Sequence, residues 1–332
     1  MGHGRRRTAA AALTAAILAL AACSSDDGGS DDPTGTPANS AGAGGAAAPP
    51  GNPAPAAVPP QAAPGTGGSY YVALGDSYAA GVRIPETVAG TPEMCSRSNS
   101  NYPHITARKL AVPTFTDVTC GGATTGDLTT AQTGRVGNGP APTAQFDALG
   151  PQTKLVTLGI GGNDIGFSEI VTTCVLNSGS TTSPTPCKDK FTENGQDVLS
   201  QRIGATGSKI DAALRTIREK SPGARILLVG YPAILPETGN GCPAQLPLAV
   251  GDLGYLRGVL DSLNTMLAER AAAGNATYVD TYTSAVGHDV CTPVGTKWVE
   301  GLNPQSPAAQ VHPNALGHEG MAAAVIAVAR QT

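Results

Sequence analysis

The sequence predicts an α/β fold with a central parallel sheet. Three observations lead to this prediction: short apolar runs typical of buried strands, helical segments that alternate with them, and polar or glycine-rich turns that end several of the runs. The expected strands lie at residues 70–74, 113–119, 154–158, 225–230 and 276–280, and the expected helices at residues 102–111, 198–220, 252–273 and 313–330. Alternation of this kind favours parallel pairing of the strands.

The ends of these elements carry further signals. Pro313 stands at the start of the last helix, where proline is preferred, and alanine, valine and methionine follow it. His312 is therefore expected at the entrance of a helix. Two stretches rich in glycine and threonine, residues 129–143 and 177–186, resemble a packed core least and are expected to line a substrate cleft.

The first expected strand ends in Gly75-Asp76-Ser77-Tyr78, and His312 lies far downstream in Val311-His312-Pro313-Asn314. A serine at the tip of a buried strand is a poor nucleophile unless a base takes its proton and donors hold the oxyanion. Ser77 and His312 are the candidates for nucleophile and base, which is the pattern of a serine esterase.

Two other strand ends supply candidate oxyanion donors. The segments are Cys120–Thr125 and Gly159–Asp164, and both are rich in glycine. The carboxyl ends of parallel strands share one edge of a sheet, where ligands bind. Glycine lets its backbone N–H approach a substrate closely, and asparagine offers a neutral amide N–H. Gly122 and Asn163 are therefore expected to join the Ser77 N–H around the oxyanion.

The four blocks resemble the SGNH, or GDSL, hydrolase superfamily, in its secreted actinobacterial esterase, lipase and phospholipase branch. The resemblance covers residues 70–332 and implies a three-layer α/β/α sandwich of the flavodoxin-like kind. It also implies Ser77 as nucleophile, His312 as base, and an oxyanion hole formed by Ser77, Gly122 and Asn163. The activity it implies is carboxylic ester hydrolysis without a metal or an organic cofactor.

One position departs from the superfamily pattern. Most members carry an aspartate three residues before the histidine, but that position here is Ala309. Some members of the resembled branch manage with a Ser-His dyad in which a main-chain carbonyl accepts the histidine N–H, and the Ala309 carbonyl is the expected acceptor. A carbonyl fixes the tautomer but carries no charge to stabilise an imidazolium.

Other interpretations of these residues carry less weight. The α/β-hydrolase elbow needs Gly-x-Ser-x-Gly, which Ser77 does not have. Asp76 and Asp164 are expected to brace their loops by hydrogen bonds. His312 and His318 are six residues apart and do not share a helical face, so no metal pair is expected. His104 is expected to be a surface or cap histidine.

The N-terminus reads as an export signal. Three arginines precede an apolar stretch that is short for a membrane span, and Leu20-Ala21-Ala22-Cys23 resembles a lipobox. Residues 1–22 are then a lipoprotein signal peptide and Cys23 receives a lipid; an ordinary signal cleaved a little later is the alternative. Residues 23–69 lack apolar bulk and form a disordered tether, and residues 70–332 form the catalytic domain.

Six cysteines remain after Cys23, an even number that implies disulfides outside the cytoplasm. Six cysteines allow fifteen connectivities. The family resemblance favours sequential pairing: Cys95–Cys120, Cys174–Cys187 and Cys242–Cys291. The formal net charge is −4 and becomes more negative when the leader arginines are lost, so nucleic acid is not an expected partner. The chain is expected to act as a monomer.

These observations favour an extracytoplasmic, lipid-anchored carboxylic ester hydrolase, held on the outer face of the cell membrane or secreted. Its substrates would be acyl or lipid esters. An acetylesterase acting on cell-wall or other polysaccharides is the alternative within this class. A solute-binding lipoprotein is the alternative from another class, but it would have no need for Ser77 and His312 together with two oxyanion donors.

Overall fold

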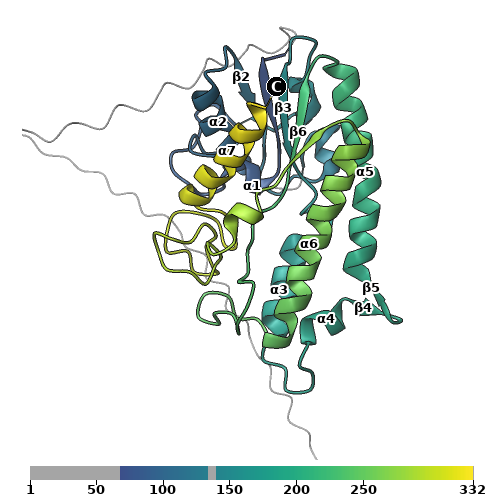
Figure 1. Ribbon diagram of the computed structural model, residues 1–332, viewed down its shortest axis with the longest axis vertical. Coiled ribbons are helices and arrows are strands. Elements are labelled where there is room, and N and C mark those ends of the chain that lie inside the picture. The colour runs from purple at the N-terminus through teal and green to yellow at the C-terminus, as the bar shows by residue number, and fades with distance from the viewer. Residues whose placement is uncertain (1–67, 134–139, 332) are drawn as a thin grey trace, which may run out of the picture. The chain divides into compact units, whose positions relative to one another are not determined.

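Five parallel strands form the central sheet in a computed structural model that describes residues 68–133 and 140–331 (Figure 1). The strands are β1 (Tyr71–Gly75), β2 (Phe115–Asp117), β3 (Leu155–Gly159), β6 (Arg225–Val229) and β7 (Thr277–Val279). They run in the order β2-β1-β3-β6-β7, and every neighbouring pair is parallel. After β1 the chain forms β2 on one side of it, and then β3, β6 and β7 on the other side, so the strand order reverses at β1. Ligands bind at such a point in open α/β sheets.

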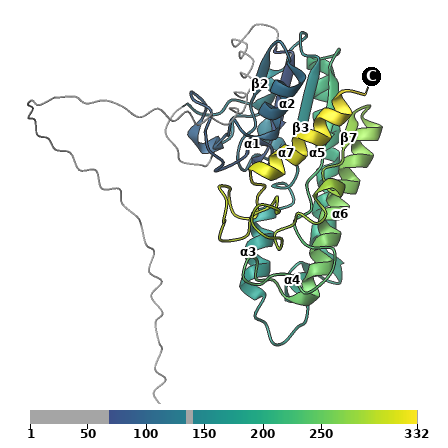
Figure 2. The same cartoon turned by 60° about the vertical axis from the view of Figure 1, so that its left-hand side comes forward.

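Helices cover both faces of this sheet. The helices are α1 (Ser77–Ala80), α2 (Tyr102–Leu110), α3 (Phe167–Asn177), α4 (Pro186–Lys190), α5 (Val198–Lys220), α6 (Val250–Ala273) and α7 (Ala315–Ala329). Helices α2 and α7 lie side by side on one face, and α5 and α6 form the opposite layer (Figures 1 and 2). Helices α3 and α4 lie beyond the carboxyl ends of the strands, beside α6 (Figure 1).

The strand residues alternate between the two cores. Tyr71 and Ala73 pack with α2 and α7, whereas Val72 and Leu74 pack with α5 and α6. Because side chains point to opposite faces with a period of two, a strand covered on both faces is apolar throughout. This is why the buried strands appear in the sequence as continuous apolar runs.

The expected α/β/α sandwich with a central parallel sheet is confirmed. All five expected strands are present, although β2 and β7 are shorter than the apolar runs that contain them. Helices α3 and α4 and the two-stranded hairpin of β4 (Thr192–Glu193) and β5 (Gln196–Asp197) have no counterpart among the expected elements. The described residues also form four short 3-10 helices: Glu93–Cys95, Thr125–Leu128, Gln145–Ala148 and Thr283–Ala285.

Three disulfides join the pairs expected from the family resemblance: Cys95–Cys120, Cys174–Cys187 and Cys242–Cys291. The second connects α3 to α4. Among the helices of the described residues, none is both long and apolar enough to cross a bilayer. The signal peptide at residues 1–22, the lipidation of Cys23 and the tether up to residue 67 concern positions outside the described residues.

Candidate active site

Ser77 begins helix α1 directly after strand β1. Asp76 caps this helix, because its Oδ1 accepts the N–H of Tyr78 at 2.9 Å. Gly75 has φ 153°, and a side chain there would meet the carbonyl oxygen of Gly159 at 2.6 Å. Glycine therefore permits the close approach of β1 to the end of β3 that exposes Ser77 at the edge of the sheet.

His312 lies against Ser77. Its Nε2 is 2.7 Å from Ser77 Oγ, and its Nδ1 is 2.7 Å from the carbonyl oxygen of Gln310. A carbonyl can only accept, so the proton is on Nδ1 and the Nε2 lone pair faces the serine hydroxyl. This is the tautomer that a base for Ser77 requires.

The expected acceptor of the histidine N–H, the Ala309 carbonyl, is wrong by one residue. The backbone N–H of Ala309 donates to the Val82 carbonyl at 2.9 Å, and the Gln310 carbonyl accepts from the ring instead. Val311 has φ 55°, in the left-handed region that valine rarely adopts. The chain therefore reverses between residues 310 and 312, which brings the carbonyl two positions before His312 next to its own ring.

Aromatic side chains hold the histidine ring in place. The ring of Tyr78 lies 4.7 Å from that of His312, and Phe167 meets the His312 ring edge to face at 5.8 Å. The Tyr78 hydroxyl also donates to the Val311 carbonyl at 2.6 Å. Tyr78 thus connects the helix that carries Ser77 to the turn that carries His312.

The expected oxyanion donors lie on adjacent loops. Asn163 lines the same cavity as Ser77, and its Nδ2 donates one hydrogen to the Ala123 carbonyl at 2.8 Å. Its second amide hydrogen is available for a ligand. Gly122 precedes Ala123 with φ 75° and does not line that cavity. In the described part of the chain, the N–H groups of Ser77 and Gly122 have no acceptor within the protein.

Tyr231, at the end of β6, connects the two loops of the site. Its hydroxyl donates to Asp76 Oδ2 at 2.6 Å and accepts the N–H of Gly162 at 2.8 Å. Burial raises the pKa of Asp76 to about 7, although the hydrogen bonds from Tyr231 and Tyr78 act in the opposite direction. Asp76 therefore braces the nucleophile turn, as the sequence predicts.

Asp164 also braces a loop. Its carboxylate accepts the Thr125 N–H at 2.9 Å and the Thr125 hydroxyl at 2.6 Å, and Lys209 lies 3.0 Å away. The loop after β3 is thereby fixed to the segment that contains Gly122.

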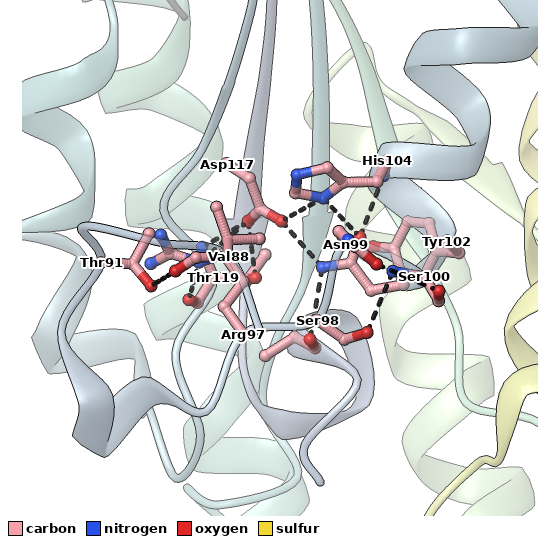
Figure 3. Close-up of polar contacts among 12 residues, drawn as sticks. Val88, Thr91, Arg97, Ser98, Asn99, Ser100, Tyr102, His104, Asp117 and Thr119 are labelled. Carbon is pink, nitrogen blue, oxygen red and sulfur yellow. Dashed lines mark hydrogen bonds and ion pairs between the residues drawn. The ribbon is translucent and has the colours of Figure 1, made fainter. Parts of the chain in front are cut away.

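A buried polar network lies at the end of β2 (Figure 3). Asp117 accepts from the Thr119 N–H and hydroxyl and lies 3.4 Å from Arg97 and 3.2 Å from His104 (Figure 3). Burial alone would raise the pKa of Asp117, but Arg97, His104 and Thr119 together hold it below its ordinary value. His104 is 1% exposed, so of its two expected positions the surface one is wrong. The cap position is confirmed, because the His104 N–H donates to Asn101, the residue that caps α2.

This network reaches the nucleophile helix through Asn101. The Asn101 amide donates to Asp117 at 2.7 Å and to the Ala80 carbonyl at 3.3 Å. Ala80 is the last residue of α1, the helix that begins with Ser77. Both ends of that helix are therefore held by buried hydrogen bonds.

The histidine turn rests on a buried ion pair. Lys297 lies 3.2 Å from Glu300, and both side chains are at most 1% exposed. The other carboxylate oxygen of Glu300 accepts from Asn314 at 2.9 Å, and the Glu300 N–H donates to the His312 carbonyl at 3.0 Å. Asn314 in turn caps α7 through the Gly317 N–H. A buried pair with this many hydrogen bonds fixes the backbone on both sides of His312.

An apolar cavity opens beside Ser77 between α3 and α6, with a volume of about 100 Å³. Its aliphatic lining includes Ile170, Val259, Leu260 and Leu263. The two glycine- and threonine-rich stretches, 129–143 and 177–186, were expected to line the cleft, but none of their described residues lines this cavity. The described ranges contain no group of three or more histidine, cysteine, aspartate or glutamate side chains that could hold a metal ion.

The sheet order is that of a flavodoxin-like sandwich, and Ser77 and His312 lie together at the carboxyl edge of its sheet. Residues 73–319 match the model of the GDSL-like Lipase/Acylhydrolase family. Lipase 2 of Streptomyces coelicolor is 41% identical over 80% of this chain and 86% of its own length, and Lipase 1 of the same organism is 34% identical over 78% and 86%. The chain belongs to the GDSL-like lipase and acylhydrolase family and is a hydrolase of the carboxylic ester type.

Two solved structures share the fold over nearly their whole length. Phospholipase A1 from Streptomyces albidoflavus is 29% identical, with a TM-score of 0.59 over 80% of this chain and 99% of that one. The extracellular lipase from Streptomyces rimosus is 26% identical, with a TM-score of 0.63 over 77% and 98%. Both confirm the expected fold class.

Proposed function

We propose that this chain is an exported, lipid-anchored esterase that cleaves acyl or lipid esters through a Ser77–His312 dyad and an acyl-enzyme intermediate. The observation that carries the proposal is the 2.7 Å contact between Ser77 Oγ and His312 Nε2, with Nδ1 tied to the Gln310 carbonyl. A nucleophile, a base and a group that orients the base are joined by consecutive hydrogen bonds, as covalent catalysis requires.

His312 first takes the hydroxyl proton as Ser77 Oγ attacks the ester carbonyl carbon. The tetrahedral intermediate collapses when His312 returns that proton to the leaving alcohol oxygen. Water, deprotonated by the same Nε2, then attacks the carbonyl carbon of the acyl-serine. The bond between that carbon and Ser77 Oγ breaks, His312 returns the proton to Oγ, and the acid leaves. The Gln310 carbonyl keeps the proton of the neutral ring on Nδ1 throughout the cycle.

The oxyanion is held by the N–H groups of Ser77 and Gly122 and by the free amide hydrogen of Asn163. These donors are fixed before the reaction, because Asn163 is anchored to Ala123 and the Asn163 loop is tied to the Ser77 turn through Tyr231. Preorganised donors stabilise developing charge without a reorganisation cost at the moment of reaction.

The substrate is an ester with an extended acyl chain. The cavity beside Ser77 is lined mainly by aliphatic side chains of α3, α6 and the segment between residues 234 and 248, which suits a hydrocarbon chain. The names of the relatives, lipases and a phospholipase A1, support the same substrate class. A polysaccharide acetylesterase would need a polar cleft for sugars at this position.

The N-terminal segment is proposed to anchor the enzyme. Residues 1–22 would be removed as a lipoprotein signal, Cys23 lipidated, and residues 23–69 would serve as a tether to the catalytic domain at 70–332. The three disulfides support an extracytoplasmic location. Cys23→Ala should move the protein from the membrane fraction to the soluble one, and an unmodified mature N-terminus beyond residue 23 would contradict the anchor.

A panel of 4-nitrophenyl esters from acetate to palmitate, with a phospholipid and an acetylated xylan, tests the activity. The expected result is a higher kcat/KM for medium and long acyl chains than for acetate, and no turnover by Ser77→Ala. A preference for acetylated xylan would favour the acetylesterase. Turnover retained in Ser77→Ala would overturn the proposed mechanism.

A further inference from the structure

A second, mainly apolar groove begins at His312 and runs along α3. It has a volume of about 260 Å³ and lies between α3 and the segment from residue 302 to residue 312. None of the described residues that line it is a lysine, arginine, aspartate or glutamate. Its apolar side chains are Phe167, Val171, Val175, Leu176, Leu302 and Val311, and the uncharged Ser168, Thr172 and Gln310 line it together with His312.

Two helical ridges of α3 face this groove. Phe167, Val171 and Val175 recur every four residues, and Leu176 follows one position later on the next ridge. Residues four apart share one side of a helix. Leu176 is 78% exposed, which leaves a large apolar side chain in water at the rim of the groove.

The groove and the cavity beside Ser77 meet at the reacting atoms. Ser77 and Asn163 line the cavity but not the groove, whereas His312 lines the groove but not the cavity. Phe167, Val171 and Val311 line both. Ser77 therefore lines one space and His312 the adjoining one.

The chemistry assigns different parts of an ester to these two spaces. After attack, the acyl carbon is bonded to Ser77 Oγ, so the acyl chain occupies the cavity that Ser77 lines. The leaving oxygen must lie within hydrogen-bond reach of His312 Nε2, because this atom returns the proton. The alcohol part of the substrate thus begins at His312 and continues along the groove.

We propose that this groove binds the alcohol part of the ester, and that its occupant is an apolar chain on that alcohol, such as the second acyl chain of a diacyl glycerolipid. The inference rests on the proposed esterase function. It makes Val175 and Leu176 determinants of alcohol specificity, separate from the residues that contact the acyl chain.

Three soluble esters test the inference in the full-length protein: ethyl butanoate, hexyl butanoate and ethyl octanoate, each below its solubility limit. The wild type should cleave hexyl butanoate with a kcat/KM about tenfold above that for ethyl butanoate, since four added methylenes become partly buried. Leu176→Ser and Val175→Thr should each reduce this ratio about threefold or more, and leave the ratio of ethyl octanoate to ethyl butanoate within about twofold.

Two matched variants serve as controls. Val259→Thr is an equivalent change on the α6 wall of the cavity. It should lower the kcat/KM of ethyl octanoate relative to ethyl butanoate (the octanoate ratio) and leave the kcat/KM of hexyl butanoate relative to ethyl butanoate (the hexyl ratio) unchanged. Leu316→Ser removes another exposed leucine, which lies on α7 outside both spaces, and should alter neither ratio.

Equal kcat/KM for the hexyl and ethyl butanoates in the wild type would overturn the groove assignment while leaving the esterase proposal intact. A Leu176→Ser variant that shifts the octanoate ratio instead would also overturn it. Failure of the wild type to cleave any of the three esters, with Ser77 unreactive toward a fluorophosphonate, would overturn the esterase proposal and this inference with it.

Discussion

The Tyr231 hydroxyl lies 2.6 Å from Asp76 Oδ2 and accepts the N–H of Gly162 at 2.8 Å. Asp76 precedes Ser77, the proposed nucleophile, and Gly162 precedes Asn163, the proposed oxyanion donor. One buried hydroxyl therefore sets the spacing between the two loops that must hold the attacking atom and the developing negative charge. Catalysis is sensitive to such spacing, because small displacements of reacting groups cost large factors in rate.

Tyr231→Phe should lower kcat by roughly 10- to 100-fold with little change in KM. The variant lacks the hydroxyl that bonds to the Asp76 carboxylate and the Gly162 N–H, so the two loops lose the spacing that the transition state needs. Steady-state kinetics on a 4-nitrophenyl ester measure this. Tyr255→Phe is the matched control: its hydroxyl also donates to an aspartate, Asp197 at 3.2 Å, but lies outside the site. Equal kinetic losses in the two variants would mean that Tyr231 has no positioning role.

Asn163→Ala should lose roughly 10² to 10³ in kcat with KM little changed, as removal of one oxyanion donor does. Circular dichroism should show an intact fold, since Asn163 is partly exposed and makes one side-chain hydrogen bond to Ala123. A change confined to KM would remove Asn163 from the oxyanion hole.

The proposed Ser77–His312 dyad predicts that no single carboxylate-to-amide change lowers kcat as far as His312→Ala does. Asp76, Asp164, Asp280, Asp289 and Glu300 are the carboxylates to change. Each already accepts a backbone N–H: Asp164 from Thr125 in the neighbouring loop, and the other four from residues close to them in the chain. A triad acid would instead cost on the order of 10⁴ in kcat when replaced. One folded variant of this set with activity as low as His312→Ala would establish a triad.

His318 should make the protein acid-sensitive. Burial, with a smaller contribution from His312, lowers the pKa of His318 to about 3, and its Nδ1 accepts the Tyr102 N–H at 3.0 Å. The unfolded chain binds a proton near the ordinary histidine pKa of about 6.5, whereas the folded protein does not. Stability from this group is therefore present above that pH and is lost as the pH falls toward 3.

His318→Asn keeps an acceptor for Tyr102 but removes the titration. Chemical denaturation at pH 7 and pH 4 should show a loss of about 3 kcal/mol in the wild type that the variant lacks, apart from effects of other groups common to both. An identical pH dependence in the two proteins would show that His318 is not held neutral in the fold.

Much of the fold was predictable because buried parallel strands are apolar throughout and their ends carry the motifs. The order of the motifs predicts that Ser77 and His312 meet, and the structure places them 2.7 Å apart. Helix α3 also had a signal: Phe167, Ile170, Val171, Cys174 and Val175 follow helical spacing. Its valines and threonines lower helix propensity, and the glycines and threonines that follow conceal its end.

Other features depend on long-range geometry. The carbonyl that orients His312 belongs to Gln310 because Val311 adopts a left-handed conformation. Valine rarely adopts this conformation, so the sequence gives no reason to expect it there. Tyr231 is one of several tyrosines near strand ends. Its hydroxyl reaches Asp76 only because β6 lies two strands from β1 in the sheet, with β3 between them. Neither could be inferred from local residue patterns.

Active-site labelling tests the central claim, that Ser77 is the nucleophile activated by His312, most directly. A fluorophosphonate probe followed by peptide mass spectrometry should place one label per chain on Ser77. Labelling should be absent in Ser77→Ala and slowed by several orders of magnitude in His312→Ala, because the hydroxyl is then left without its base. Stoichiometric labelling of another residue, or full ester hydrolysis by Ser77→Ala, would contradict the account.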